Sequence, residues 1–438
     1  MNIAIAGYGI EGEASYDYWK SSNNALTIVD ERKNLTHLPE GAKVEIGPGA
    51  FGKLEDYDLV IRSPSINPRK LPYGNKVWSA TNEFFSKCPA IIIGVTGTKG
   101  KGTTASIIAS ILREAGKTVH LVGNIGVPAL TLLKDIKPKD IVVYELSSFQ
   151  LWDIKKSPHI AVILMIEPDH LDIHDSLEDY LYAKSRIQAY QGTDDICLYH
   201  PYNHFSAQVA GIIPLTETSE PAQMYSRRLR YGIQDDGQVY AQDGEFCSGD
   251  QFVGDVNALP IVGAHNVENA CAAISAVRLI GVKNEAINAG LKAFEGLPHR
   301  LKLVKEVRGV KYFDDSIATT PGSAIAALQS FNGPKVIILG GSNKGADYRE
   351  LVSIAGETEV QVIAVGQNGD EIAKLCQESG VLVERITGDM VSIVQAATSH
   401  AQDLGAVVIL SPASASFDMF KSYTDRGNQF IRAVEELG

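Results

Sequence analysis

Short apolar runs alternate with segments of helical periodicity along most of the chain, and this alternation is typical of a mostly parallel sheet with crossover helices. The pattern recurs in three successive regions and therefore predicts an α/β fold with three domains. The strands expected from the apolar runs are 3–6, 26–30 and 59–62 in the first region, 91–95, 118–122, 141–145 and 159–166 in the second, and 310–314, 336–341, 360–365 and 407–411 in the third.

Two interruptions of the pattern set the expected organisation. Residues 196–259 carry short segments of period two with Asp-Gly turns, which indicate a small antiparallel excursion built of hairpins. Gly296-Leu-Pro-His-Arg300 places glycine and proline between two periodic stretches, as at a domain boundary. We therefore predict a Rossmann-like domain at 1–88, a central P-loop-type sheet domain at 89–295 and a doubly wound C-terminal domain at 296–438.

The stretch from Ile91 to Leu112 holds a strand, a glycine-rich turn and the start of a helix. These are the parts of a phosphate-binding loop, in which bare backbone N–H groups approach polyphosphate oxygens and a lysine adds a positive charge. Lys101 is that lysine, and Thr103 and Thr104 offer hydroxyls to a magnesium ion. The strict pattern has a glycine where Val95 stands and Ser or Thr where Gly102 stands, so the match is incomplete.

Polar residues follow three consecutive strands of the central region. Asn124 follows the first, Glu145 ends the second, and Asp169-His170 follow the third within a run that also holds His174. The carboxyl ends of parallel strands meet at one edge of a sheet, so we expect a hard-cation and substrate site beside the phosphate loop.

The first region opens with Gly7-Tyr-Gly-Ile-Glu-Gly12, and Asp30 ends a strand about twenty residues later. This spacing resembles a dinucleotide fingerprint and leaves open an oxidoreductase that binds NAD, but 88 residues hold fewer strands than a full dinucleotide fold. A mononucleotide or nucleotide-sugar site is the alternative. In the third region, polar strand ends at 314–316, 340–344 and 411–416 predict one further ligand site.

Composition narrows the class of protein. With 45% hydrophobic residues, 21% charged residues and a net charge of −12, the chain reads as globular, and no basic run supports a nucleic-acid partner. The five cysteines are scattered singly, as in a reducing compartment. We see no basic leader and no apolar stretch of membrane-spanning length, so we expect a cytoplasmic enzyme without a membrane partner. We also expect a monomer.

Taken together, the motifs resemble those of the Mur ligase family over essentially the whole length. Eight pieces carry the resemblance in order: Gly-Thr-Lys-Gly-Lys-Gly-Thr (97–103), Gly-Asn-Ile-Gly (123–126), Glu-Leu-Ser-Ser-Phe-Gln-Leu (145–151), Asp-His-Leu-Asp (169–172), Ala-Lys-Ser-Arg-Ile (183–187), His-Asn-Val-Glu-Asn-Ala (265–270), Gly-Leu-Pro-His-Arg (296–300) and Leu-Ser-Pro-Ala-Ser-Ala-Ser-Phe-Asp (410–418). The third and last are similar to those of the family member that joins D-glutamate to UDP-N-acetylmuramoyl-L-alanine.

The resemblance implies ATP-dependent amide formation through an acyl phosphate, with ATP and Mg²⁺ bound. The positions that match nucleotide-binding residues are Gly97, Thr98, Lys99, Gly100, Lys101, Gly102, Thr103, Asn266, Asn269, Arg300 and Asp315. Those that match metal-site residues are Thr103, Glu145, His170 and Lys184, the last being a lysine that the family carbamylates. Lys101, Glu145, His170 and Lys184 are thereby the expected catalytic residues.

The resemblance also assigns the substrate sites. Asp30, Arg32, Ser63, Pro64 and Asn124 match the residues for the UDP-sugar, and Thr319, Lys344, Ser416, Phe417 and Tyr423 match the glutamate pocket. Two departures leave alternatives open. Ile317 and Thr320 stand where the family has lysine and asparagine, which admits L-glutamate as the substrate. Gly102, directly after the loop lysine, is similar to the folylpolyglutamate synthases, so a ligase of that type is the second alternative. A sugar-nucleotide sensor without catalysis is the third.

Overall fold

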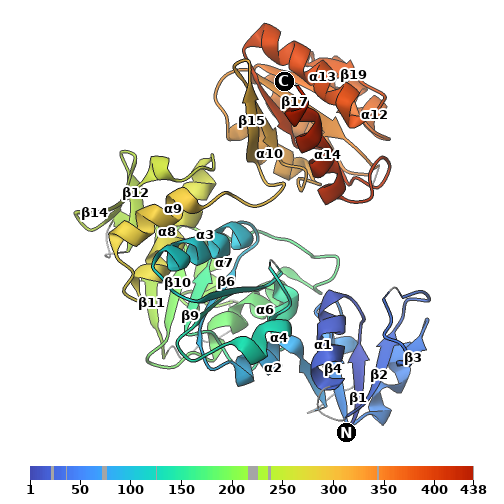
Figure 1. Cartoon of the computed structure of the whole chain (residues 1–438), viewed down its shortest axis with the longest axis vertical. Helices are drawn as coiled ribbons and strands as arrows, with labels where there is room; N and C mark the ends of the chain where they lie inside the picture. The colour runs from blue at the N-terminus through green and yellow to red at the C-terminus, as the bar shows by residue number, and fades with distance from the viewer. Residues whose placement is uncertain are drawn as a thin grey trace. The chain divides into compact units, whose positions relative to one another are not determined.

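The computed structural model describes residues 1–20, 24–35, 37–71, 76–124, 126–215, 225–234, 238–342 and 345–437. The chain divides into two compact units, one formed by residues 1–258 and 267–294 and the other by residues 259–266 and 295–438. Both units are α/β, with helices packed on largely parallel sheets (Figure 1). The predicted fold class is thus confirmed, and the boundaries at 88/89 and 295/296 stay predictions.

The N-terminal sheet of the first unit has five parallel strands in the order β3-β2-β1-β4-β5. Ile3 and Ile5 of the central strand enter one hydrophobic cluster, while Ala4 and Ala6 enter another. Burial on both faces explains why this strand is a continuous apolar run. The elements are β1 Asn2–Ala6, α1 Ile10–Lys20, β2 Ala25–Asp30, β3 Lys43–Ile46, β4 Leu59–Arg62, β5 Val77–Ser79 and α2 Ala80–Lys87.

The central sheet of the first unit has six parallel strands in the order β11-β10-β9-β6-β8-β7. Its strands are β6 Ile91–Thr96, β7 Val119–Gly123, β8 Ile141–Glu145, β9 Ile160–Ile163, β10 Ile196–Tyr199 and β11 Arg227–Arg230. Its helices are α3 Lys101–Glu114, α4 Ala129–Leu132, α5 Ser148–Leu151, α6 Leu177–Ala189, α7 His204–Val209, α8 Ala264–Arg278 and α9 Asn284–Ala293.

The prediction that residues 196–259 form only hairpins is wrong for β10 and β11, which extend the parallel sheet. Cys197 and Leu198 are both fully buried, so β10 is covered on both faces and does not alternate. The hairpin prediction is confirmed for β12 Val239–Gln242, β13 Glu245–Ser248 and β14 Gln251–Asp255, which pair antiparallel. Asp243 and Gly244, with φ of 52° and 83°, form the tight turn between the first two.

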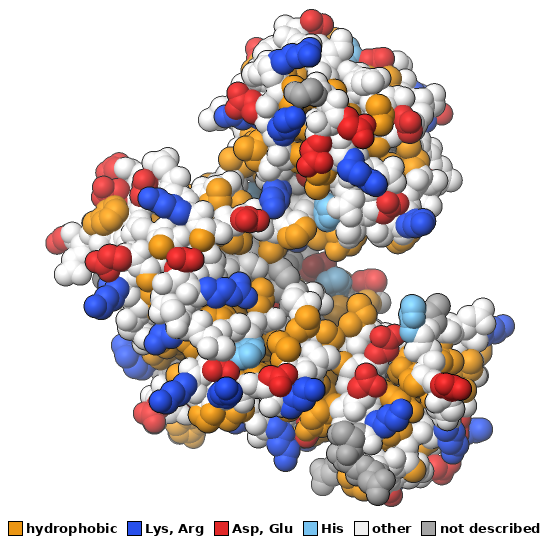
Figure 2. Space-filling model, in the orientation of Figure 1, with side chains coloured by type: hydrophobic (Ala, Val, Ile, Leu, Met, Phe, Trp, Pro, Cys, Tyr) orange, Lys and Arg blue, Asp and Glu red, His pale blue; other side chains and the backbone are white. Residues whose placement is uncertain are grey.

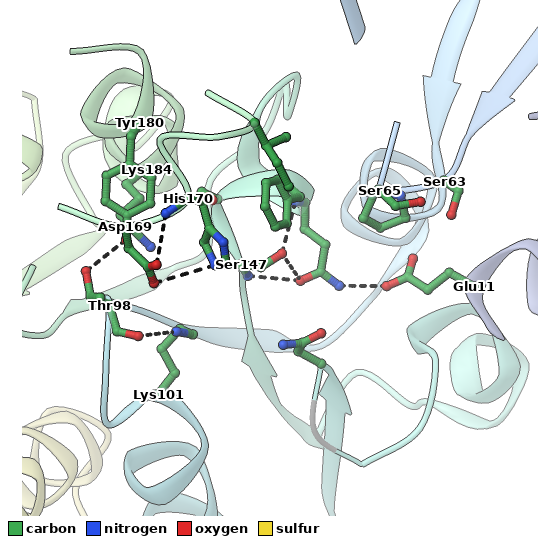
Figure 3. Close-up of a pocket in the computed structure, with 16 residues that line it drawn as sticks. Glu11, Ser63, Ser65, Thr98, Lys101, Ser147, Asp169, His170, Tyr180 and Lys184 are labelled. Carbon is green, nitrogen blue, oxygen red and sulfur yellow. Dashed lines mark hydrogen bonds and ion pairs between the residues drawn. The ribbon is translucent and has the colours of Figure 1, made fainter. Parts of the chain in front are cut away.

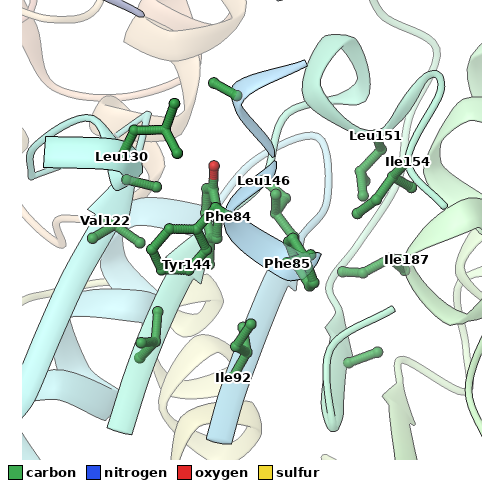
Figure 4. Close-up of a cluster of buried hydrophobic side chains, with 14 of the residues drawn as sticks. Phe84, Phe85, Ile92, Val122, Leu130, Tyr144, Leu146, Leu151, Ile154 and Ile187 are labelled. Atoms are coloured by element: carbon green, nitrogen blue, oxygen red, sulfur yellow. The ribbon is translucent and has the colours of Figure 1, made fainter. Parts of the chain in front are cut away.

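An aromatic cluster joins α2 to the central sheet (Figure 4). The ring of Tyr144 on β8 lies edge-on to Phe84, with centroids 5.5 Å apart, and is stacked on Phe85 at 5.6 Å. All three side chains are fully buried. The helix that follows the N-terminal sheet is therefore part of the core beneath the central sheet.

The second unit contains a six-stranded sheet in the order β15-β16-β20-β17-β18-β19, in which only β15 runs antiparallel to its neighbour. Helices pack against this sheet, and the buried side chains between sheet and helices form two separate hydrophobic clusters. The elements are β15 Lys302–Val307, β16 Val310–Asp314, α10 Pro321–Gln329, β17 Lys335–Gly340, α11 Arg349–Gly356, β18 Val360–Val365, α12 Gly369–Glu378, β19 Leu382–Arg385, α13 Met390–Leu404, β20 Val407–Leu410 and α14 Tyr423–Glu435.

Acidic and basic side chains are interspersed on the face of the molecule that Figure 2 shows. Within the described parts of the chain, every helix is too short or too polar to cross a membrane.

The helix of the phosphate loop, α3, packs closely against α9. Ser110 Oγ donates a hydrogen bond to the carbonyl of Gly290 at 2.7 Å. A Cβ on Gly290 would lie 2.3 Å from the Cα of Ile111, and that atom belongs to helix backbone, which cannot move aside cheaply. The glycine therefore sets the distance between the two helices.

We predict that Gly290→Ala destabilises the first unit by about 1–3 kcal/mol because α9 must move away from α3. Urea unfolding followed by circular dichroism would measure the shift in midpoint. Gly192→Ala is the matched control in the same unit, since its Cβ would meet only the end of Asp195 at 3.9 Å. Equal midpoints for the two variants would contradict the packing argument.

Candidate active site

The glycine-rich loop connects β6 to α3, in the strand, loop and helix order that the sequence predicts. Gly100 has a φ of 82°, a left-handed conformation that disfavours other residues. A Cβ at this position would also lie 2.3 Å from Oδ1 of Asn269, which comes from α8. Asn269 lies within α8, which begins five residues earlier, and its side-chain amide packs on the loop.

Lys101 is the first residue of α3, and its ammonium lies over the loop. Its Nζ donates to the carbonyl oxygens of Gly97 at 3.0 Å and Thr98 at 2.8 Å. Thr98 is anchored to the segment after β9, because its N–H donates to the carbonyl of Met165 at 3.0 Å and its Oγ1 to that of Glu167 at 2.9 Å. The charge therefore stands at the N-terminus of a helix, where phosphate oxygens are favoured.

A cavity of about 450 Å³ opens within the first unit between the phosphate loop, the segments that follow β8 and β9, and the turns of the N-terminal sheet (Figure 3). It brings together predicted site residues that lie far apart in the sequence. Those that line it are Ser63, Pro64, Thr98, Lys101, Asn124, His170 and Lys184. Predicted sugar-nucleotide, phosphate and metal positions thus share one cavity.

Three other predicted residues of this unit occupy different surroundings. Glu145 and Thr103 are almost fully buried, with 6% and 3% of their surfaces exposed, and neither belongs to the cavity lining. Lys99 is largely exposed and forms an ion pair with Glu167 at 3.2 Å. Gly97 and Gly102 complete the loop on either side of Gly100 and Lys101.

Lys184 projects from α6 and is only 2% exposed. Its Nζ donates to the carbonyl of Gly97 at 2.8 Å and lies 3.5 Å from Oγ1 of Thr96. Burial lowers the pKa of this amine well below its usual value, and the charge of Lys101 lowers it further. A sequence pattern alone would assign this residue to a solvated helix face, and only the family motif singled it out.

His170 is held at the cavity by its own backbone and by Phe149. It has a φ of 54°, its side chain is about half exposed, and its ring centroid lies 5.0 Å from that of Phe149. Asp169 approaches the same imidazole, with Oδ2 3.5 Å from Nε2. The imidazole and the carboxylate are therefore both available at the cavity wall.

His174, predicted to belong to the same polar run, is fully buried. Its Nδ1 lies 3.1 Å from Oδ2 of Asp179 and its Nε2 3.1 Å from Oγ of Ser148, and its ring stacks on Phe149. Burial lowers its pKa. His174 therefore fixes the loop that carries His170 and does not belong to the cavity lining.

Arg62 was missed by sequence reasoning, because an arginine at the end of an apolar strand reads as a surface charge. Its side chain is fully buried and pairs with Asp153 at 2.6 Å. It also donates to the carbonyls of Ser63 at 3.3 Å, Pro64 at 3.2 Å and Ile66 at 2.9 Å. One guanidinium thus fixes the turn after β4 against the central sheet.

Asp30 and Arg32 organise the glycine-rich turn after β1. The Asp30 carboxylate accepts from the Tyr8 N–H at 2.8 Å and pairs with Arg32 at 2.7 Å. Burial raises the pKa of Asp30, but hydrogen bonds from Arg32 and Tyr8 lower it overall. The carboxylate is therefore engaged by the protein, whereas the Arg32 side chain is 59% exposed and accessible to a ligand.

The described residues contain no group of three or more His, Cys, Asp or Glu side chains placed to hold a metal. Mg²⁺ commonly takes only one or two carboxylates and completes its shell with phosphate oxygens and water. Asp169 and Glu145 are both close enough to Lys184 to raise its pKa, so carboxylates do flank the phosphate loop. This donor set fits a magnesium ion that arrives with a nucleotide.

The second unit holds the remaining predicted residues. The Asp315 carboxylate accepts from Ser411 Oγ at 2.7 Å and from the Leu301 N–H at 3.1 Å, and burial raises its pKa to about 7. Arg300, Thr319, Phe417 and Tyr423 are exposed, whereas Ser416 is buried. Asn266 donates to the Val262 carbonyl at 2.6 Å. Lys344 lies outside the described residues.

Arg426 is a second buried arginine that the sequence did not reveal. Its guanidinium donates to the carbonyls of Ser414 at 3.0 Å and Ser316 at 2.7 Å. It therefore connects the segments after β16 and β20, which carry predicted ligand residues.

Comparison with known proteins identifies the family. A model of the Mur ligase middle domain matches residues 95–277, and one of the Mur ligase glutamate ligase domain matches residues 299–414. A UDP-N-acetylmuramoylalanine–D-glutamate ligase of Acetivibrio thermocellus is 35% identical over 99% of this chain and 96% of its own length. The chain belongs to the Mur ligase family. The resemblance seen in the motifs is thereby confirmed.

Further Mur ligases agree with this assignment. The enzyme of the same name from Streptococcus thermophilus is 34% identical over 99% of this chain and 97% of its own length. Among solved structures, UDP-N-acetylmuramate-alanine ligase MurC of Thermotoga maritima is 18% identical with a TM-score of 0.59, and the two chains are covered completely. MurF ligase of the same organism, in complex with ADP, has the same identity and TM-score over 100% of this chain and 95% of its own. These two show the shared fold.

We predict that Arg62→Met lowers the free energy of unfolding of the first unit by about 3–5 kcal/mol, because Asp153 and four carbonyls, that of Phe149 included, lose a buried partner. The midpoint of urea unfolding measures this. Arg349→Met is the control, since it breaks a pair with Asp347 whose side chains are 79% and 59% exposed, and exposed ion pairs contribute little to stability. A shift no larger than that of the control would contradict the anchoring role.

Proposed function

We propose that this Mur ligase joins the carboxylate of UDP-N-acetylmuramoyl-L-alanine to the amino group of D-glutamate, with cleavage of ATP, in the synthesis of peptidoglycan precursors. The observation that carries the proposal is the single cavity that Ser63, Asn124 and Lys101 line together. A carboxylate delivered from the N-terminal sheet would meet a phosphoryl group at the phosphate loop. Relatives of at least 30% identity that bear this activity in their names support it.

The proposed reaction requires positive charge, which the phosphate loop supplies. The substrate carboxylate attacks the γ-phosphorus, ADP leaves, and an acyl phosphate forms; the glutamate amine then attacks the acyl carbon, loses a proton and displaces phosphate. Two anions must approach each other in the first step, so positive charge is needed where they meet. Lys101 supplies it beside the N–H groups of the loop. Bound Mg²⁺ adds charge neutralisation at the phosphates, with Glu145, His170 and the Thr103 hydroxyl as its proposed protein ligands.

Lys184 has the properties required for the carbamylation seen in the family. A lowered pKa leaves part of the amine neutral, and a neutral amine can attack carbon dioxide and release a proton. The resulting carbamate is an anion that can support a cation, and it removes the repulsion between Lys184 and Lys101. We propose this modified form as the active one.

The second unit is proposed to supply the remaining contacts. Arg300, Asp315 and Asn266 of this unit are proposed nucleotide-binding residues, as is Asn269 of the first unit. The glutamate would be held by Thr319, Lys344, Ser416, Phe417 and Tyr423. L-glutamate is the second candidate substrate, because Ile317 and Thr320 replace a lysine and an asparagine of the family motif.

The proposal is tested by incubating the protein with UDP-N-acetylmuramoyl-L-alanine, ATP, Mg²⁺ and each glutamate enantiomer, with phosphate release and product mass as readouts. We expect product with D-glutamate. Product with L-glutamate alone would establish the second candidate. A folded protein that forms product with neither would overturn both, and folate-dependent phosphate release would then favour a folylpolyglutamate-type ligase.

Replacement of Lys101 separates catalysis from sugar-nucleotide binding. We predict that Lys101→Ala lowers turnover at least about 1,000-fold, because the developing phosphoryl charge loses its counter-charge. Calorimetry should find the affinity for UDP-N-acetylmuramoyl-L-alanine unchanged. Lys117→Ala, just beyond the far end of α3, removes an exposed lysine and should leave turnover as in the wild type. Turnover that survives Lys101→Ala would exclude this phosphate loop as the reaction site.

A further inference from the structure

Tyr180 on α6 contacts both the phosphate loop and Lys184 in the candidate active site. The proposed function gives it no role. It is 1% exposed and lines the cavity (Figure 3). Its hydroxyl lies 2.8 Å from Oγ1 of Thr98 in the phosphate loop. Its ring centroid lies 4.8 Å from Nζ of Lys184. One side chain therefore contacts the loop and the buried amine.

The hydroxyl of Tyr180 completes the anchoring of Thr98. Thr98 Oγ1 accepts from the N–H of Glu167 and donates to its carbonyl, both at 2.9 Å. A threonine hydroxyl has a single hydrogen, so the Tyr180 hydroxyl is the donor in the third contact. Thr98 is thereby fully bonded at its side chain, while its carbonyl accepts from Lys101. Loss of the Tyr180 hydroxyl would loosen the residue on which Lys101 rests.

The ring of Tyr180 forms a wall beside Lys184. The two residues are four positions apart on one helix, so their side chains share a face. The Lys184 amine lies between this ring and the carbonyl of Gly97, 2.8 Å away. The ring itself is held edge-on by His174, with centroids 5.3 Å apart. The ring thus has a packing contact outside the phosphate loop.

We propose that Tyr180 is a positioning residue that couples the phosphate loop to Lys184: its hydroxyl fixes the loop and its ring fixes the amine. The kinetic part of this inference rests on the proposed ligase activity. Because different atoms of the side chain serve the two roles, two substitutions separate them. Tyr180→Phe removes only the hydroxyl, and Tyr180→Leu removes the ring as well.

For Tyr180→Phe we expect the KM for ATP to rise about fivefold, with kcat within about twofold of the wild type, since one hydrogen bond to the loop is lost. For Tyr180→Leu we expect the same rise together with a fall in kcat of at least about tenfold, because Lys184 loses its fixed position. Tyr182→Phe, on the same helix but 50% exposed, is the control and should match the wild type. Thermal unfolding checks that all three variants fold.

Two further readouts do not depend on turnover. Calorimetry with a non-hydrolysable ATP analogue should show about fivefold weaker binding to Tyr180→Phe. A crystal structure of Tyr180→Leu should show Lys184 Nζ displaced from the Gly97 carbonyl. If the wild type forms no product but both results hold, the ligase proposal fails and the positioning role stands.

Two outcomes would overturn the inference. One is an unchanged KM for ATP and unchanged analogue affinity in Tyr180→Phe. The other is a kcat that falls equally in Tyr180→Phe and Tyr180→Leu, since the ring would then make no separate contribution.

Discussion

The side-chain nitrogens of two lysines share one carbonyl oxygen in this protein. Lys101 and Lys184, from different helices, both donate to the oxygen of Gly97, at 3.0 and 2.8 Å. Like charges held this close in a buried place repel each other, which is unfavourable unless an anion or a modification compensates. The arrangement therefore favours a polyanion above the loop, a neutral or carbamylated Lys184, or both. Contacts elsewhere in the first unit hold the elements that carry these two side chains.

That support comes from several directions. Asn269 packs on Gly100 from α8, and α9 packs on α3 through Gly290. On the side of the N-terminal sheet, the buried Arg62 fixes the turn that carries Ser63 and Pro64. Preorganised positive charge is effective in catalysis because no reorganisation is required when the reacting charge develops. These contacts thus hold the charged loop in place.

The sequence predicted those features that follow from local chemistry. The glycines of the phosphate loop, the polar residues Glu145 and Asp169 at or after strands, and the α/β fold were all visible as patterns of residue type and spacing. The role of Lys184 came only from family motifs, because a single lysine in a helix carries no signal of burial. The site assignments stay predictions, whereas the fold class and the family are confirmed.

What the sequence could not provide were contacts between residues distant along the chain. Arg62 reaches Asp153 and Tyr180 reaches Thr98, and neither partner can be chosen from local pattern. The edge strand β11 was mistaken for part of a hairpin because its sequence, Arg-Arg-Leu-Arg, has little apolar character, and the short run of β10 beside it was assigned with it. In each case tertiary packing decided the outcome and local preference did not.

The central claim is that a triphosphate binds where Lys101 and Lys184 converge. The most direct measurement is a crystal structure with a non-hydrolysable ATP analogue and Mg²⁺. We expect the γ-phosphate within hydrogen-bond distance of Lys101 Nζ, above the Gly97–Gly102 loop. A nucleotide bound elsewhere, with this loop free of phosphate, would contradict it.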